Sequence, residues 1–321
     1  MSIIQRLLET QSLGTADRTQ VIGASEAAAV LGLSPWATPT EVWMSKRLGL
    51  AEESGTTKAH KRGHRLERAV LEEMAEQMGA DCEPGNAIDE PFIGREDTPW
   101  LGAHFDGALT VRDSGEEWIA ECKTARDSAQ WGDEGLAQLP QHILVQATVQ
   151  SLIADLPVAV GCYLPFKDDW KVYRLPRDIG LEADVLTMLE NWYVTHVVQG
   201  VQPPMDGSAK FAKHLAQKYG PTLEGMRDAT ADEEALVREL VAAKAAAKVA
   251  ESEADRLGNV LRDIIGTSEG IRCGAGKVTW TWQRGAERID AKALRLAYPD
   301  IAEQFSVRGD DARVLRVKGG K

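Results

Sequence analysis

The sequence predicts an α/β (α+β) fold in which a mixed central sheet is flanked by helices, followed by a C-terminal extension with a helix and a β-hairpin. Helical and strand-like segments alternate over residues 18–200, which is typical of an α/β core. Residues 230–264 then read as one long helix rich in Ala, Glu and Lys, and a hairpin pattern follows it. We therefore expect a core over residues 1–204 and an extension over residues 205–321.

Length and composition are those of a globular protein. The 321 residues are 43% hydrophobic and 27% charged, enough for a substantial core. No run of about 18 apolar residues predicts a membrane span, and the N-terminus is too short and polar for a signal peptide. The four cysteines are scattered without a CxxC motif, which argues against a zinc site or a disulfide framework and favours a reducing cytoplasm.

The net charge of −12 argues against a nucleic-acid binder if it is taken alone. Net charge is a mean over the whole surface, however, and a DNA site needs only local positive potential.

Two short helices are expected near the N-terminus. Ser25 stands at a suitable N-cap position before a helix-forming run that Gly32 closes. Thr38 and Pro39 begin the second helix. A helix N-terminus that carries Ser25, with Arg18 upstream, can bind an anion, although plain capping explains the spacing better.

Residues 56–79 predict one long helix with an apolar face at i+4 intervals. Gly63 inside this helix costs roughly 1 kcal/mol relative to Ala and therefore indicates a close approach. Glu67 lies one turn further, beside the apolar face. The first half of the helix is either a phosphate-contacting surface or a solvated face, and its basic residues are Lys58, Lys61, Arg62, Arg65 and Arg68.

The remaining core elements follow in order. We expect a strand around residues 87–93, a hairpin over 108–123, a helix over 141–156, a second hairpin over 158–175 and an amphipathic helix over 178–200.

The extension begins with an irregular connector over residues 205–225. The helix over 230–264 suits helix packing or a coiled-coil hairpin. A β-hairpin over 271–283, a short helix near 291–298 and a basic terminal strand complete the chain. The tail carries positive charge at Arg308, Arg313, Arg316, Lys318 and Lys321.

One hairpin places acidic groups and a lysine together. Side chains two apart in a strand share a face, so Glu121 and Lys123 project together while Cys122 points the other way, into the core. The turn can bring Asp106 to the same end of the sheet. Carboxylates are ligands for Mg²⁺ or Mn²⁺, and the lysine can orient a water or balance phosphate charge. These residue types are common, so a surface hairpin with an ordinary Glu–Lys pair is the alternative.

Several motifs occur together in a recognisable order. They are Arg18 with IGASEAAAVLGLSPW, then RGHRLERAV, HFDG, ECK and HILVQATVQ, over roughly residues 18–155. In this combination the chain resembles the YqaJ-type viral recombinases, which are phage alkaline exonucleases related to lambda exonuclease. They belong to the PD-(D/E)xK nuclease superfamily, so the resemblance implies a restriction-endonuclease-like core.

The resemblance also implies residue roles. Asp106, Glu121, Glu67 and the backbone carbonyl of Cys122 would hold the metal, Lys123 would position the water, and Gln146 would help to orient the nucleophile. Arg18 and Ser25 would grip a 5′-phosphate, and Lys61, Arg62 and Arg65 would contact DNA. Two positions depart from the pattern, because Phe105 replaces the proline before Asp106 and Thr148 stands where a second glutamine is expected.

The function implied is metal-dependent 5′→3′ degradation of linear double-stranded DNA, leaving 3′ single-stranded tails for recombination by annealing. Two Mg²⁺ ions would act, and Mn²⁺ would substitute. The resemblance further implies a ring-shaped homo-oligomer, a trimer, with a phage single-strand annealing protein as partner. Such a protein would be phage- or prophage-encoded and would work in the bacterial cytoplasm without a membrane.

Three alternatives remain open. A Cas4-like nuclease would hold an iron–sulfur cluster through four cysteines, and the scattered cysteines argue against it. A restriction-type endonuclease would also cut circular DNA. A non-catalytic DNA-binding or assembly protein with a relic core would tolerate loss of Asp106, Glu121 or Lys123, whereas all three are present.

Overall fold

The computed structural model describes residues 1–49, 58–126, 129–135, 137–220, 225–274, 276–307 and 313–317. The chain forms two compact units, Met1–His214 and Leu215–Lys321. The boundary expected from the sequence, between residues 204 and 205, precedes this division.

A five-stranded mixed sheet forms the centre of the first unit, as the sequence predicts. Its order is β2-β5-β6-β7-β8, and β6 and β7 are parallel while the other neighbours are antiparallel. The strands are β2 (Ala80–Pro84), β5 (Gly107–Val111), β6 (Glu117–Thr124), β7 (Val158–Leu164) and β8 (Asp169–Leu175).

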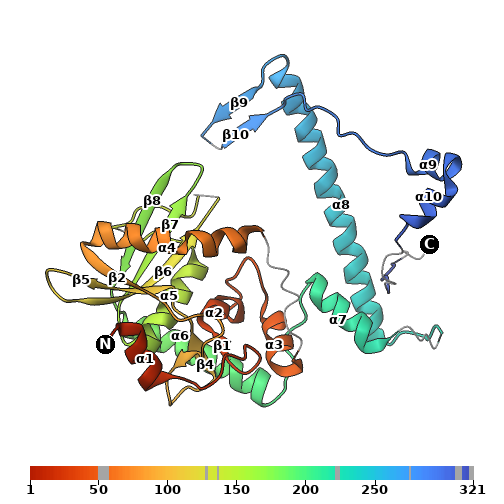
Figure 1. Ribbon diagram of the computed structural model, residues 1–321. Helices are drawn as coiled ribbons and strands as arrows, with labels where there is room; N and C mark the ends of the chain where they lie inside the picture. The colour runs from red at the N-terminus through yellow and green to blue at the C-terminus, as the bar shows by residue number, and fades with distance from the viewer. Residues whose placement is uncertain are drawn as a thin grey trace. The chain divides into compact units, whose positions relative to one another are not determined.

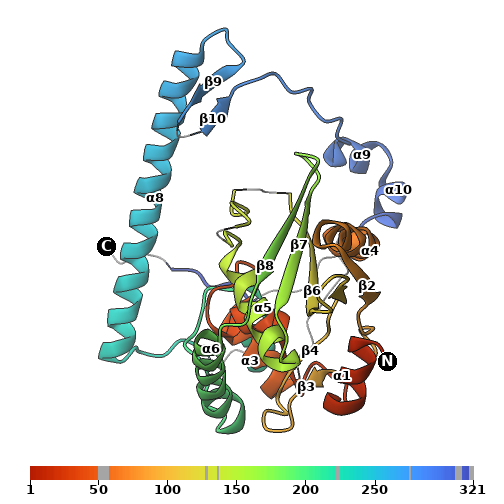
Figure 2. The ribbon, with the colours of Figure 1, turned by 90° about the vertical axis from the view of Figure 1, so that its left-hand side faces the viewer.

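Helices cover both faces of this sheet (Figures 1 and 2). Helix α4 (Lys58–Met78) buries an apolar stripe that includes Val70 and Met74 against one face. Helices α5 (Gln141–Ala154), α2 (Ala24–Val30) and α6 (Ile179–Trp192) pack together on the core of the other face. The alternation of β6 therefore divides its side chains between two separate cores.

A small second sheet leads the chain into the central one. It has the order β1-β4-β3, from β1 (Ile22–Gly23), β4 (Leu101–Ala103) and β3 (Ile93–Gly94). Helix α1 (Ile3–Gln11) packs beside β3, and helix α3 (Pro39–Leu48) beside α2.

The predicted cap is right for α3 and wrong for α2. Thr38 caps α3, since its Oγ1 accepts a hydrogen bond from the Glu41 N–H at 3.2 Å. In α2 the N-cap is Gly23, because β1 runs directly into the helix, and Ser25 is its second residue. The Glu26 carboxylate accepts the Gly23 N–H at 2.8 Å.

The prediction of a strand around residues 87–93 is also wrong. Residues 87–90 form a turn in which the Glu90 N–H donates to the Ala87 carbonyl at 3.0 Å. The strand lies earlier, as β2, and only Ile93–Gly94 is extended in β3. Because of its charged residues and Pro84, β2 lacks the apolar pattern by which a strand is predicted from the sequence. It is an edge strand, and a proline is tolerated there.

The segment that leads from the first unit into the second is more helical than expected. Helix α6 continues as a π-helix over Tyr193–Val198. Helix α7 (Ala209–Tyr219) occupies part of the predicted irregular connector, because an amphipathic run with buried Phe211 lies between its proline and glycine signals.

In the second unit the long helix and the hairpin are confirmed. Helix α8 (Ala231–Ile265) is one continuous helix and not a helical hairpin. Strands β9 (Gly270–Cys273) and β10 (Gly276–Thr279) pair antiparallel, and α9 (Ala291–Ala297) and α10 (Pro299–Gln304) follow.

The predicted basic terminal strand is not found over residues 313–317, which form no strand in the described part of the chain. Arg308, Lys318 and Lys321 lie outside the described residues. Among the helices that are described, none combines the length and apolarity needed to cross a lipid bilayer.

Candidate active site

Asp106 stands where β5 begins and reaches across to β6. Pairing of the two strands stops at Gly107 and Ala120. The backbone N–H of Cys122 therefore has no β5 partner, and Asp106 Oδ2 accepts it at 2.7 Å. The Asp106 carboxylate thus continues the strand ladder by one hydrogen bond and is fixed at the edge of the sheet.

Glu121 and Lys123 project together from β6, as the strand period predicts. The Glu121 side chain is only 2% exposed, and Lys123 Nζ forms an ion pair with its Oε1. Cys122 points to the opposite face and is buried in the core beneath α4. The alternative of an ordinary exposed Glu–Lys pair is therefore wrong.

Two glutamines of α5 hold the Glu121 carboxylate. Gln146 Nε2 donates to Glu121 Oε1 at 2.7 Å, and Gln150 Nε2 donates to Oε2 at 2.5 Å. Both glutamines are buried. Thr148 donates only to the Leu144 carbonyl of its own helix, so Gln150 supplies the second amide.

Charges crowd this edge of the sheet. Burial, followed by the Glu121 charge and a smaller effect of Glu67, raises the pKa of Asp106 to about 8. Burial lowers the pKa of Lys123, but the Glu121 and Asp106 carboxylates outweigh it and raise that pKa to about 12. A single lysine therefore faces several acids, an arrangement in which a further cation is stabilised.

A cavity of ≈ 580 Å³ opens onto Asp106. Glu67 of α4 lies in its wall and pairs with His64 at 2.9 Å between Oε1 and Nδ1. The other lining residues include Arg68, Cys82, Gly85, Asn86 and His104. The cavity therefore brings the predicted helix acid to the predicted strand acid.

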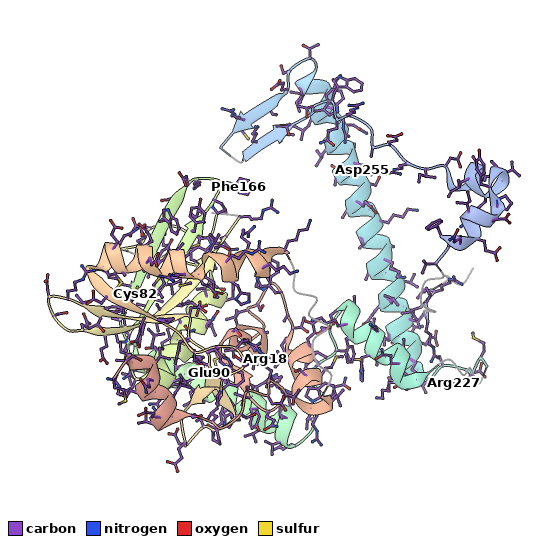
Figure 3. The ribbon with its side chains drawn as sticks, in the orientation of Figure 1. Arg18, Cys82, Glu90, Phe166, Arg227 and Asp255 are labelled. Atoms are coloured by element: carbon purple, nitrogen blue, oxygen red, sulfur yellow. The ribbon has the colours of Figure 1, made fainter. Side chains whose placement is uncertain are left out.

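His104 lines the same cavity as Asp106. His104 Nε2 donates to the Glu90 carbonyl at 2.9 Å, while its Nδ1 is buried with no hydrogen-bond partner in the described part of the chain. Burial lowers the pKa of His104, and the positive charge of Arg18 lowers it further. Arg18 and Glu90 are labelled in Figure 3.

None of the predicted DNA contacts is among the described residues that line this cavity. Ser25 is exposed on the first turn of α2. Lys61, Arg62 and Arg65 lie on the first half of α4, and none of the three is among the described residues that line the cavity. A Cβ added at Gly63 meets nothing within 4 Å, so the close approach expected there does not occur within the described residues.

The donor set suits a hard divalent cation. In the present conformation no three His, Cys, Asp or Glu side chains of the described residues converge closely enough to hold a metal. The hydrogen bonds above nevertheless leave Asp106 Oδ1 and one lone pair of Glu121 Oε2 for a ligand. In a strand the N–H and C=O of one residue point to the same side, so the Cys122 carbonyl also faces the Asp106 edge.

The sequence predicts site roles for Asp106, Glu121, Lys123, Glu67 and Gln146, but it assigns none to Gln150 or His104. Gln150 has a signal, its i+4 spacing from Gln146 on one helix face. For His104 the only signal in the sequence is its position two residues before Asp106.

The mixed sheet between helices, with Asp106 immediately before one strand and Glu121 and Lys123 on the next, is the arrangement that the resemblance to PD-(D/E)xK nucleases implies. The family model of the YqaJ-like viral recombinase domain matches residues 15–157. This part of the chain is thus similar to YqaJ-like viral recombinase domains.

Two known proteins are similar to the chain. The uncharacterized protein YqaJ of Bacillus subtilis (strain 168) is 26% identical over 297 residues, which cover 90% of this chain and 88% of that protein. The crystal structure of an alkaline exonuclease from Laribacter hongkongensis matches with a TM-score of 0.46 and 18% identity, covering 64% of this chain and 97% of the other. The same exonuclease in complex with dAMP matches with the same TM-score.

Proposed function

We propose that this protein is a metal-dependent deoxyribonuclease that degrades linear double-stranded DNA in the 5′→3′ direction. The observation that carries the proposal is the joining of Asp106, Glu121 and Lys123 at one sheet edge, beside a cavity that also contains Glu67. The 3′ single-stranded tails would serve recombination by annealing, in keeping with the viral recombinase domain.

The reaction is hydrolysis of a phosphodiester. The oxygen of a water forms a bond to phosphorus, the P–O3′ bond breaks, and the leaving 3′ oxygen takes up a proton. The strand that remains keeps a 5′-phosphate and can be cut again. Bound Mg²⁺ would supply charge neutralisation and activation of the water.

The chain's own residues prepare this step. Asp106, Glu121, Glu67 and the Cys122 carbonyl would hold Mg²⁺, with Mn²⁺ as a substitute. Lys123 would donate hydrogen bonds to the water or to a phosphate oxygen. Gln146 and Gln150 keep the Glu121 carboxylate from rotating, so its free lone pair stays directed toward the edge of the sheet.

The direction of cutting would come from a 5′-phosphate site formed by Arg18 and Ser25. Lys61, Arg62 and Arg65 of α4 would contact the backbone of the incoming duplex. A ring-shaped homotrimer would let an acidic protein line only its channel with positive charge. A single-strand annealing protein would then take the 3′ tail.

The test compares substrates and one variant. Purified protein is incubated with Mg²⁺ and linear duplex that carries a 5′-phosphate or a 5′-hydroxyl, and with closed circular duplex, alongside Lys123→Ala. We expect loss of the 5′-phosphorylated linear duplex alone, no loss with Lys123→Ala, and none after EDTA. Cutting of the circle would instead make the protein an endonuclease, and no cutting with Mg²⁺ or Mn²⁺ would leave a binding protein.

A further inference from the structure

The β9–β10 hairpin of the second unit has two different faces. Its register pairs Lys277 with Arg272 and Val278 with Ile271. Side chains of directly paired residues share a face, so one face carries two cations and the other two apolar side chains. Arg272 and Lys277 are both exposed.

Opposed like charges weaken a two-stranded ribbon. Directly opposite cations repel each other, and neither Arg272 nor Lys277 forms an ion pair within the described part of the chain. Residues 270–288 carry four basic side chains and one acidic one, a net charge of +3 in a chain of −12. A polyanion would relieve this repulsion.

Tryptophans follow directly on β10. Trp280 is 49% exposed and Trp282 is fully exposed, and Arg284 comes two residues later. The Trp280 N–H donates to the Glu269 carbonyl at 2.9 Å, so Trp280 is anchored at the end of the hairpin. An exposed indole is a stacking platform for an unpaired base, and nearby arginines can follow the phosphates.

We propose that the hairpin segment 270–288 binds single-stranded DNA, through stacking on Trp282 and Trp280 and through phosphate contacts of Arg272 and Lys277. Single strand fits better than duplex because base stacking on an indole requires bases that are not already stacked in a helix. This second site goes beyond the proposed nuclease and rests on it only in that the nuclease would produce the single strand.

The test measures binding of fluorescein-labelled oligo(dT) to the full chain by anisotropy, in EDTA so that no strand is cut. We expect Trp282→Ala to weaken binding about tenfold, within the range for one stacked base, and Trp282→Phe to restore most of it. Two controls should bind like the unchanged protein: Phe305→Ala, another exposed aromatic of the second unit, and Lys248→Gln, an exposed cation of α8.

Salt dependence tests the cations separately. Arg272→Gln combined with Lys277→Gln should reduce the slope of log affinity against log salt by roughly 1.4, since each contact with a single strand contributes about 0.7. Removing the opposed charges also relieves repulsion, so this variant should fold at least as well as the parent, which melting curves check.

Several results would overturn the inference. Affinity within twofold of the parent for both hairpin variants would do so. So would a change of oligomeric state with Trp282→Ala at unchanged affinity, because the hairpin would then join copies of the chain. Lys123→Ala separates the two proposals: it should lose cutting and keep oligo(dT) binding. A chain that never cuts DNA but binds oligo(dT) through Trp282 would refute the nuclease alone.

Discussion

Gln150 of α5 donates its side-chain amide to Glu121 Oε2 of β6 at 2.5 Å, in a region where Gln150 is completely buried. The carbonyl oxygen of the same side chain, Gln150 Oε1, has no hydrogen-bond partner in the described part of the chain. A buried amide with one unsatisfied oxygen is costly, so we expect Gln150 to serve the orientation of Glu121 more than stability.

The first prediction concerns Gln150→Leu. The free energy of unfolding should fall by about 1–2 kcal/mol, since the loss of a hydrogen bond to a buried carboxylate is only partly offset by removal of an unsatisfied oxygen. Cleavage of 5′-phosphorylated duplex should fall about 10- to 100-fold, as for other residues that orient metal-binding side chains, with a higher Mg²⁺ requirement. Single-turnover rates across a Mg²⁺ titration measure this.

Thr148→Ala is the matched control, because it changes the same helix and removes a hydrogen bond that never reaches the site. Rates within twofold of the parent are expected for it. If Gln150→Leu cuts at the parental rate at every Mg²⁺ concentration, the orienting role of Gln150 is wrong.

These contacts also show how much of the candidate site could be predicted from the sequence. The strand period of β6 was enough to place Glu121 and Lys123 on one face and Cys122 in the core. It could not place Gln150, because a glutamine in a helix is buried only if neighbouring elements cover it. Those elements, α2, α6 and the sheet, come from distant parts of the chain.

The errors in the fold have the same origin. An edge strand such as β2 is stabilised by pairing with β5 and not by its own apolar pattern, so its sequence resembles a loop. The N-cap of α2 is set by where β1 stops pairing with β4. Local periodicity identified the long helices and the hairpins, whereas tertiary pairing decided the short elements.

The second prediction concerns Gly85, which lies between β2 and the loop that carries Asp106. Its N–H donates to the Asp106 carbonyl at 3.0 Å. A Cβ at this position would stand 1.7 Å from the Phe105 carbonyl oxygen and 2.5 Å from its carbon, both backbone atoms. Gly85→Ala should therefore lower the free energy of unfolding by about 3 kcal/mol, at the upper end of overpacking effects, and should lower cleavage too.

Gly63→Ala is the opposite case. It lies inside α4 with open space around an added Cβ, so the free energy of unfolding should rise by about 1 kcal/mol. Urea unfolding of both variants measures these effects. Equal stability of the two variants would contradict the close packing at Gly85.

The third prediction concerns thiol reactivity. Cys82 and Cys273 are exposed, and Cys122 and Cys162 are buried. Burial raises the pKa of Cys162 to about 12 and that of Cys122 well above its usual range, so neither forms the reactive thiolate near neutral pH. Ellman's reagent should therefore titrate two thiols in the native protein and four in guanidinium. Rapid reaction of a third thiol would mean that the core around β6 and β7 opens easily.

The last prediction concerns the ion pair that fastens α1 to β6. Arg6 donates to both Glu117 oxygens, at 3.1 and 2.5 Å. The hydrogen bonds from Arg6 lower the pKa of Glu117 in the folded state. The pair therefore stabilises the fold above the unfolded pKa of Glu117, and this stabilisation disappears as the pH falls through the lower folded pKa.

Both side chains are partly exposed, so the effect of Glu117→Gln at pH 7 should be only about 0.5 kcal/mol, typical of a solvent-screened pair. The difference between parent and variant should shrink toward zero as Glu117 becomes protonated in acid, and 1 M salt should reduce it at pH 7. Glu72→Gln, which removes an exposed pair with Arg68 within α4, is the control for a local helix contact. A Glu117→Gln effect that stays constant with pH would mean that packing, and not charge, joins α1 to the sheet.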